Sequence, residues 1–398
     1  MFRLGRKWRW GIALLLLALI LAGAYAYFIG TRVMLRQAEA FAFRRMTVPQ
    51  LAEQGTFQFF YATNRLAGNP QASVGDRFES QRGPELRFGS FDTRIEPSLG
   101  LGMLLDASDW FLNEEIRLEA VTTLQRHQLV EKLREQVQES PDRSVLLVVH
   151  GFREAFPSAL RKTAFLAHVL DINTPVVVFD WPGDQGSSLR GYRRARAVAQ
   201  ESGDELAAMI RLLVDDVQPE RLWVIANSMG GQVVVDAFHL LDKDASYSDA
   251  QTEIENVILT APDVDHAEFN STFREEIGRL AGNVTVYVSS NDRALLASRL
   301  INRRQRLGES TLDPGNPGQV RQSERISELL EAGDDSLVLV DVTPVNRTRN
   351  FHNFSLETPE FFDDLFLRLI HDTVPASREL YFLETPEGVR YFVLTRGR

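Results

Sequence analysis

The chain has 398 residues, 44% hydrophobic and 25% charged, a composition typical of a globular protein with one large core or two modest ones. It contains no cysteine, which excludes disulfides, thiolate metal sites and cysteine nucleophiles. The net charge is −10, and because residues 1–10 carry four basic groups and no acid, the rest of the chain carries −14, which argues against nucleic acid as a partner.

The amino terminus has the pattern of a membrane-targeting segment. A basic, aromatic stretch at residues 1–10 precedes an uncharged apolar run at 11–30 that is long enough to cross a bilayer as a helix. We expect a signal anchor in residues 1–30, with a cleaved signal peptide as the alternative, because small residues at 22–26 fit a cleavage site. Residues 31–55 predict a short helical stalk. In either case we expect the body to lie on the extracytoplasmic (periplasmic) side.

The body, residues 56–375, alternates apolar runs with helical patterns. It opens with the strand-like FQFFYATNR, continues through strand candidates to about residue 118, and then predicts an amphipathic helix at 121–137. Six apolar runs follow: SVLLVVHG, TPVVVFDWPG, RLWVIANSMGG, ENVILTAPD, NVTVYVSSND and SLVLVDVTP. Strands of this kind are buried on both faces, so the pattern predicts a mostly parallel central sheet with helices on both faces.

Two later segments depart from this alternation. Residues 303–335 contain LDPGNPGQ and several charges, too polar and too broken for a core, so we expect an excursion over the carboxyl edge of the sheet. The tail, residues 376–398, has two aromatic-rich runs about a Thr-Pro-Glu-Gly turn, which predicts a terminal β-hairpin extension.

The segment 224–231, VIANSMGG, has the pattern of a nucleophile elbow, in which a strand ends on a serine and runs directly into a helix. The serine would be Ser228. A tight, strained turn needs small residues two positions before and after the serine, and Ala226 and Gly230 meet this need. Short strings of this kind are common by chance, so the placement between strand and helix is what favours Ser228 as a nucleophile.

A serine nucleophile needs a histidine as its base. Three of the seven histidines lie in helical patterns, where a core-edge or surface role fits better: His127, His168 and His239. His150 belongs to another motif, His266 closely follows a strand and His371 lies late in a helix. His352 lies in a loop beyond the last core strand, where the order serine, acid, histidine places the base, so we expect His352 in this role. The alternative is a loop histidine that caps a turn.

The acid that orients the base should leave a strand end between the serine and the histidine. Asp292 follows NVTVYVSSN and fits this position, and Asp263, one strand earlier, is the rival. A helix N-cap is the alternative role for both, and the one that Asp263 could hold.

An acyl-transfer enzyme also needs backbone N–H groups aimed at the developing oxyanion. The segment HGF follows a predicted strand, the second one before the elbow strand along the chain, and an oxyanion loop is expected at this position. We expect the amides of Phe152 and Met229 to be the donors, and a plain turn at Gly151 is the alternative.

The motifs FYATNR, VVHGF, FDWPG, ANSMGG, APDVD, SSNDRAL and FHNF together resemble a bacterial α/β-hydrolase family of otherwise unassigned function, related to esterases and lipases. The resemblance covers about residues 57–369. It implies an α/β-hydrolase fold and a triad of Ser228, Asp292 and His352. Family members often have histidine before the serine, whereas this chain has Asn227, a departure that bears on packing around the site.

We expect structural roles, and no catalytic role, for four residues of the shared FYATNR and FDWPG motifs: Tyr61, Arg65, Asp180 and Trp181. An ion pair of Arg65, or Trp181 as part of the pocket lining, would be such a role.

These patterns predict a serine hydrolase, of the carboxylesterase or lipase kind, that acts on an ester or related acyl bond through an acyl-enzyme. The expected partners are an acyl substrate and, through the amino terminus, a membrane. The alternative is a catalytically silent, membrane-tethered scaffold; a peptidase or transacylase would show the same motifs. No nucleotide, nicotinamide or HExxH zinc motif occurs, so we expect no cofactor. Asp263, Asp265 and His266 are too close in one loop to predict a metal site.

Overall fold

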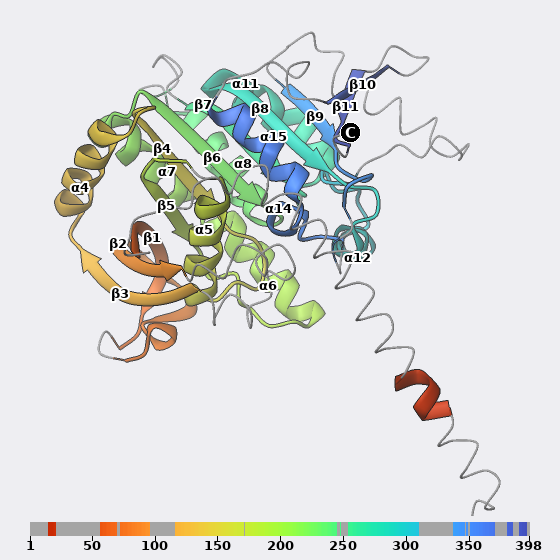
Figure 1. Cartoon of the computed structure of the whole chain (residues 1–398), viewed down its shortest axis with the longest axis horizontal. Coiled ribbons are helices and arrows are strands. Elements are labelled where there is room, and N and C mark those ends of the chain that lie inside the picture. Colours follow the sequence, from red (N-terminus) through yellow and green to blue (C-terminus); the bar gives the residue numbers. More distant parts are fainter. Residues whose placement is uncertain are drawn as a thin grey trace, which may run out of the picture.

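The computed structural model of the protein describes residues 15–20, 56–69, 72–95, 116–170, 172–244, 247, 254–309, 337–346, 348, 351–370, 380–384 and 390–395. Residues 15–20 are helical and lie far from the body of the molecule (Figure 1). Within the described parts of the chain, no helix has the length and apolarity needed to cross a bilayer. The rest of the predicted anchor and the predicted stalk at 31–55 lie outside the described residues.

One eleven-stranded sheet runs through the body, in the order β10-β11-β9-β8-β7-β6-β4-β5-β1-β2-β3 (Figure 1). The strands are β1 (Thr56–Ala67), β2 (Phe78–Ile95), β3 (Ile116–Leu124), β4 (Ser144–Val149), β5 (Val176–Asp180), β6 (Arg221–Asn227), β7 (Ile254–Thr260), β8 (Ala281–Val288), β9 (Leu337–Asp341), β10 (Tyr381–Glu384) and β11 (Arg390–Val393). The six apolar runs form β4 to β9. In the sheet order given above, every pair of neighbouring strands between β11 and β1 is parallel. The predicted parallel sheet is therefore confirmed.

Helices cover both faces of this sheet, as predicted. They are α4 (Arg126–Glu139), α5 (Phe156–Leu170), α6 (Leu189–Glu201), α7 (Gly203–Arg211), α8 (Gly230–Asp242), α10 (His266–Glu268), α11 (Arg274–Leu280), α12 (Arg293–Asn302), α14 (Phe354–Glu357) and α15 (Pro359–Ile370), with a 3-10 turn η1 (Val74–Asp76) and π-helical turns η2 (Leu212–Val217) and η3 (Phe269–Phe273). Leu147 of β4 packs in a core with α4, α6, α7, α8 and α11, while Leu146 packs in a second core with α5, α12, α14 and α15. The sheet therefore separates two cores, because successive strand residues point to opposite faces.

The predicted helix at 121–137 is wrong in its first turn. Residues up to Leu124 belong to β3, where Val121 pairs with Phe91 of β2, and the helix α4 begins only at Arg126. Val121 lies eight residues before Leu129, which is two four-residue steps of the spacing that Leu129, Leu133 and Val137 share, so the helical period can be extended into the strand. Pairing with the long strand β2 overrides this local pattern.

The tail and the polar segment at 303–335 also meet the sheet. Strands β10 and β11 form an antiparallel hairpin, and β11 extends the central sheet by pairing with β9. The start of the polar segment lies at the carboxyl edge, because the amides of Leu307 and Gly308 donate to the carbonyls of Val264 and Pro262, which follow β7. The expectation that the segment is too polar for a core was wrong for residues 306–309, which are all buried, and residues 310–335 lie outside the described residues.

Candidate active site

Ser228 lies at the carboxyl end of β6, immediately before α8, in the turn that the elbow pattern predicts. Its φ of 53° is in the left-handed region, a strained conformation for a serine. The amide of Ser228 donates to the carbonyl of Thr260 at 2.9 Å, which fixes the turn against β7. A Cβ at Gly230 would lie 2.5 Å from the carbonyl oxygen of His150, so this position needs glycine for the close approach of β4.

His352 and Asp292 lie in line with the serine. Nε2 of His352 is 2.9 Å from Oγ of Ser228, and Nδ1 is 2.6 Å from Oδ2 of Asp292. The three residues come from segments that follow β6, β8 and β9, so the carboxyl edge of the sheet brings them together. The geometry is that of a nucleophile, a base and an orienting acid.

Asp292 has two contacts that use its two carboxylate oxygens separately. Oδ2 contacts His352, while Oδ1 accepts hydrogen bonds from the amides of Ala294 and Leu295 and so caps α12. The helix thereby holds the carboxylate in one orientation. Burial lowers the pKa of His352, but the charge and hydrogen bond of Asp292, helped by the charge of Asp263, outweigh burial and raise it above its usual value.

The structure gives Asp263 a different position from Asp292. Its carboxylate accepts hydrogen bonds from Arg306 at 2.7 Å, Ser298 at 2.6 Å and Tyr192 at 2.8 Å. The N-cap role suggested for Asp263 is wrong, since the residue that caps α10 is Asp265. Asp263 instead supports the elbow through its own amide, which donates to the carbonyl of Ser228 at 3.0 Å.

The predicted oxyanion loop lies beside the serine. A Cβ on Gly151 would be 3.1 Å from Cβ of Ser228, so the loop backbone passes close to the nucleophile. Within the described part of the chain, the amides of Phe152 and Met229 donate no hydrogen bond. Both amides are therefore free to donate to a ligand.

Asn346 is a supporting residue that the sequence did not single out. Its buried side-chain amide donates to Oγ of Ser289 at 2.8 Å and to the carbonyl of Phe351 at 2.7 Å. It thereby joins the loop of Asp292 to the loop of His352. Nothing in the sequence marks it, because a loop asparagine has no periodicity and its partners are distant in the chain.

Asn227, which precedes the nucleophile, packs as the sequence suggested. Its Oδ1 accepts hydrogen bonds from Thr260 at 2.9 Å and from Ser355 at 3.1 Å. These bonds join the end of β6 to β7 and to α14, which follows His352.

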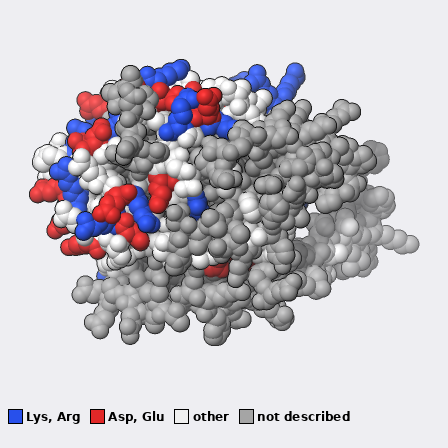
Figure 2. All heavy atoms as spheres, turned by 90° about the horizontal axis from the view of Figure 1, so that it is seen from above, with Lys and Arg blue, Asp and Glu red and all other residues white. Residues whose placement is uncertain are grey.

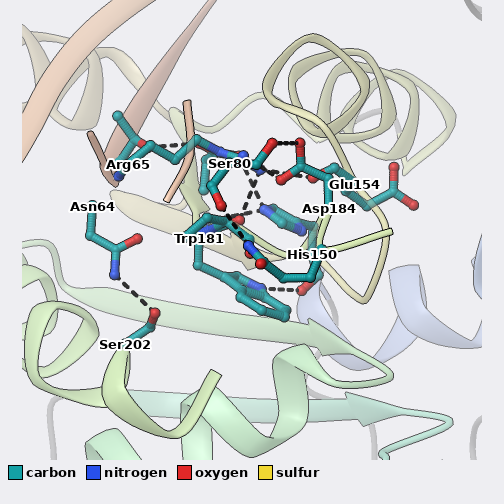
Figure 3. A network of polar contacts seen from close by, with 12 residues as sticks. Asn64, Arg65, Ser80, His150, Glu154, Trp181, Asp184 and Ser202 are labelled. Atoms are coloured by element: carbon teal, nitrogen blue, oxygen red, sulfur yellow. Dashed lines mark hydrogen bonds and ion pairs between the residues drawn. The ribbon is translucent and has the colours of Figure 1, made fainter. Parts of the chain in front are cut away.

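A network of polar contacts lies beside the predicted oxyanion loop (Figure 3). Arg65, at the end of β1, is its centre: Nε donates to Asp180 at 2.8 Å and Nη1 to Asp184 at 2.6 Å. Its Nη2 donates to the carbonyls of Glu154 and Trp181 at 2.8 and 2.9 Å. One guanidinium therefore fixes the loops after β4 and β5 together, and the expected ion pair of Arg65 is present.

His150 and Trp181 complete this network. The indole Nε1 of Trp181 donates to the carbonyl of His150 at 2.8 Å, and the two rings are stacked with centroids 5.5 Å apart. Trp181 is fully buried, so the suggestion that it lines the pocket is wrong. Nε2 of His150 lies 3.1 Å from Oδ1 of Asp180. Burial raises the pKa of Asp180, but Arg65 and His150 outweigh burial and lower it.

We expect Arg65→Met to destabilise the fold by about 3–5 kcal/mol, because it leaves the fully buried Asp180 without its main countercharge. Denaturant unfolding at neutral pH would measure this loss. The double variant Arg65→Met/Asp180→Asn should lose less than the single variant, since it removes both charges.

Arg82→Met is the matched control for this measurement. The Arg82 side chain is 31% exposed and pairs with Glu205, so its loss should cost roughly 1 kcal/mol or less. An Arg65→Met variant no less stable than Arg82→Met would show that the buried pair contributes little.

None of the other described histidines forms a hydrogen bond with Ser228, and three of them lie on helices of the two cores. His127 is exposed on α4, burial lowers the pKa of His168 on α5 to about 4, and Nδ1 of His239 contacts Glu276 at 2.7 Å. His371 is outside the described residues. Among the residues that the structure describes, no cluster of histidine and acidic side chains is arranged to hold a metal ion.

The sheet, the elbow and the placement of the three polar residues define an α/β hydrolase. The chain belongs to the family described as "Alpha/beta hydrolase of unknown function (DUF900)", whose profile matches residues 125–366. No curated protein matches the sequence.

Solved structures of esterases are similar at low identity. Esterase Pf2001 of Pyrococcus furiosus is 11% identical, with 56% of this chain and 82% of that chain covered and a TM-score of 0.33. A thermophilic esterase of Thermogutta terrifontis is 14% identical, with 58% and 85% covered and a TM-score of 0.31. The family assignment rests on the profile match and not on these structures.

Proposed function

We propose that the protein is a serine hydrolase that cleaves an ester or related acyl bond. The observation that supports this most is the line of contacts from Ser228 Oγ to His352 Nε2, at 2.9 Å, and from Nδ1 to Asp292 Oδ2, at 2.6 Å. Such a line supplies an activated nucleophile and a base held in one tautomer.

In the proposed reaction Oγ of Ser228 attacks the acyl carbonyl carbon while Nε2 of His352 takes the hydroxyl proton. The amides of Phe152 and Met229 donate to the oxyanion that forms. His352 then returns the proton to the leaving group, and the acyl-enzyme remains. Water, deprotonated by His352, attacks the acyl carbon and releases the acid, which restores the Ser228 hydroxyl.

A fluorophosphonate probe tests this proposal directly. The purified protein is labelled beside a Ser228→Ala variant, and the modified peptide is mapped by mass spectrometry. We expect covalent attachment at Ser228 that is absent from the variant. A folded protein that takes no label would contradict an activated serine and favour the scaffold alternative.

The location of the body is a separate proposal that rests on the sequence. An apolar run at 11–30 after a basic stretch supports a body on the extracytoplasmic side, tethered or released after cleavage. The intact mass of the mature protein would distinguish the two cases, and a full-length protein confined to the cytoplasm would contradict both.

A further inference from the structure

Exposed large hydrophobic side chains are concentrated on two helices. Outside residues 15–20, those of the described chain are Leu189 on α6 and Leu296 and Leu300 on α12, exposed by 48%, 44% and 72%. Leu296 and Leu300 are one turn apart and lie on the outer face of α12, while Leu295 and Ser298 are buried. These leucines contribute little to the core.

Arginines lie near the same leucines in the sequence. Residues 189–201 and 293–304 contain eight arginines and one acidic residue, Glu201 at the end of α6, in a chain whose net charge is −10. Arg190, Arg193 and Arg303 are exposed and form no ion pair with the described residues. Elsewhere the surface differs: Figure 2 shows a face of the body on which basic and acidic side chains are interspersed.

The two helices flank the candidate active site. The cap of α12 is Asp292, which contacts His352. On α6, Tyr192 packs its ring 5.7 Å from that of Phe152, and its hydroxyl lies 2.8 Å from Oγ of Ser298 on α12. Both helices follow strands of the parallel sheet, so they begin at its carboxyl edge, where Ser228 also lies directly after β6.

We propose that the outer faces of α6 and α12 dock on an anionic lipid bilayer. Guanidinium groups bind lipid phosphates, and leucines between them enter the boundary between headgroups and acyl chains. Nucleic acid would match the arginines but leave the leucines in water. Docking would turn the carboxyl edge of the sheet, and the serine with it, toward the lipid. The proposal rests on surface composition and does not require Ser228 to be catalytic.

Because the chain has no cysteine, single thiols can report the orientation of the full-length protein. Leu300→Cys is labelled with a polarity-sensitive dye, and the protein is bound to vesicles that contain a spin-labelled lipid quencher. Vesicles of phosphatidylcholine alone are compared with vesicles containing about 30 mol% phosphatidylglycerol. Glu131→Cys, exposed on α4 far from this edge, is the matched control (Figure 1).

We expect strong quenching at position 300 in the anionic vesicles, at least several-fold weaker quenching without phosphatidylglycerol, and none at position 131. A tether alone would leave both dyes in water. No quenching at 300, equal quenching at both positions, or no dependence on anionic lipid would overturn the proposal. So would selective binding of a single-stranded oligonucleotide without quenching in vesicles.

Charge reversal provides a second, independent measurement. Arg190→Glu/Arg193→Glu/Arg303→Glu should weaken partitioning into the anionic vesicles by at least about 100-fold, because the loss of each surface arginine costs about fivefold and each glutamate adds repulsion. A matched triple reversal distant from this edge, Arg126→Glu/Arg134→Glu/Arg143→Glu, uses exposed arginines on α4 and directly before β4, and it should leave the quenching unchanged. Equal effects of the two triple variants would show only a response to total charge and would also overturn the proposal.

Discussion

Ser228→Ala is expected to lower turnover of a p-nitrophenyl ester by on the order of 10⁶-fold, if serine, histidine and aspartate act as one unit. The hydroxyl that His352 contacts at 2.9 Å would be gone, so the base would have no serine proton to accept. The methyl group of alanine fits the same space. Initial rates at saturating ester measure kcat, and the unfolding midpoint shows that the fold is retained.

A serine nearby in the chain is the control for this loss. Ser290 is exposed in the loop before Asp292, and Ser290→Ala should keep turnover within about twofold, as expected of a surface substitution. Residual activity of Ser228→Ala within tenfold of wild type would place the chemistry at another residue. Equal losses in both variants would indicate damage to the loop.

The strand pattern of the parallel sheet could be predicted because each strand is buried on both faces. Runs such as those of β4 and β6 are almost continuously apolar. When helical patterns separate such runs, a parallel sheet buried on both faces is the fold that explains them. Ser228 could be identified for a related reason, since the elbow requires small neighbours at fixed spacing. These signals are local in the sequence.

Features that depend on distant partners could not be predicted. Arg306 is charged and follows a helix, yet it is fully buried because Asp263, more than forty residues earlier, binds its guanidinium. Val121 continues a helical period but joins β3, because β2 offers a partner strand. Asn346 connects two loops that only the folded sheet brings together. For Arg306 and Val121 tertiary contacts override the local pattern, and for Asn346 the local pattern contains no signal at all.

The choice between Asp292 and Asp263 was open in the sequence, and two conservative variants test it. Asp292→Asn should lower kcat by about 10⁴-fold, because an amide cannot hold His352 in the tautomer that accepts the serine proton. Asparagine is also a good N-cap, so α12 should keep its start and the fold its stability. Asp263→Asn should chiefly lower stability, by about 3–5 kcal/mol, since it weakens the pairing of the buried Arg306.

The pH profile separates an orienting acid from a structural one. The Asp292 charge helps to raise the pKa of His352, and only neutral His352 can act as the base, so kcat/KM should fall as pH drops through that pKa. Without the charge the pKa falls, so the acid limb of Asp292→Asn should move to lower pH. Asp263 raises the same pKa without bonding His352, so Asp263→Asn should move the limb less. A larger fall in kcat and a larger limb shift in Asp263→Asn would reverse the assignment, and Asp292 would then be only a helix cap.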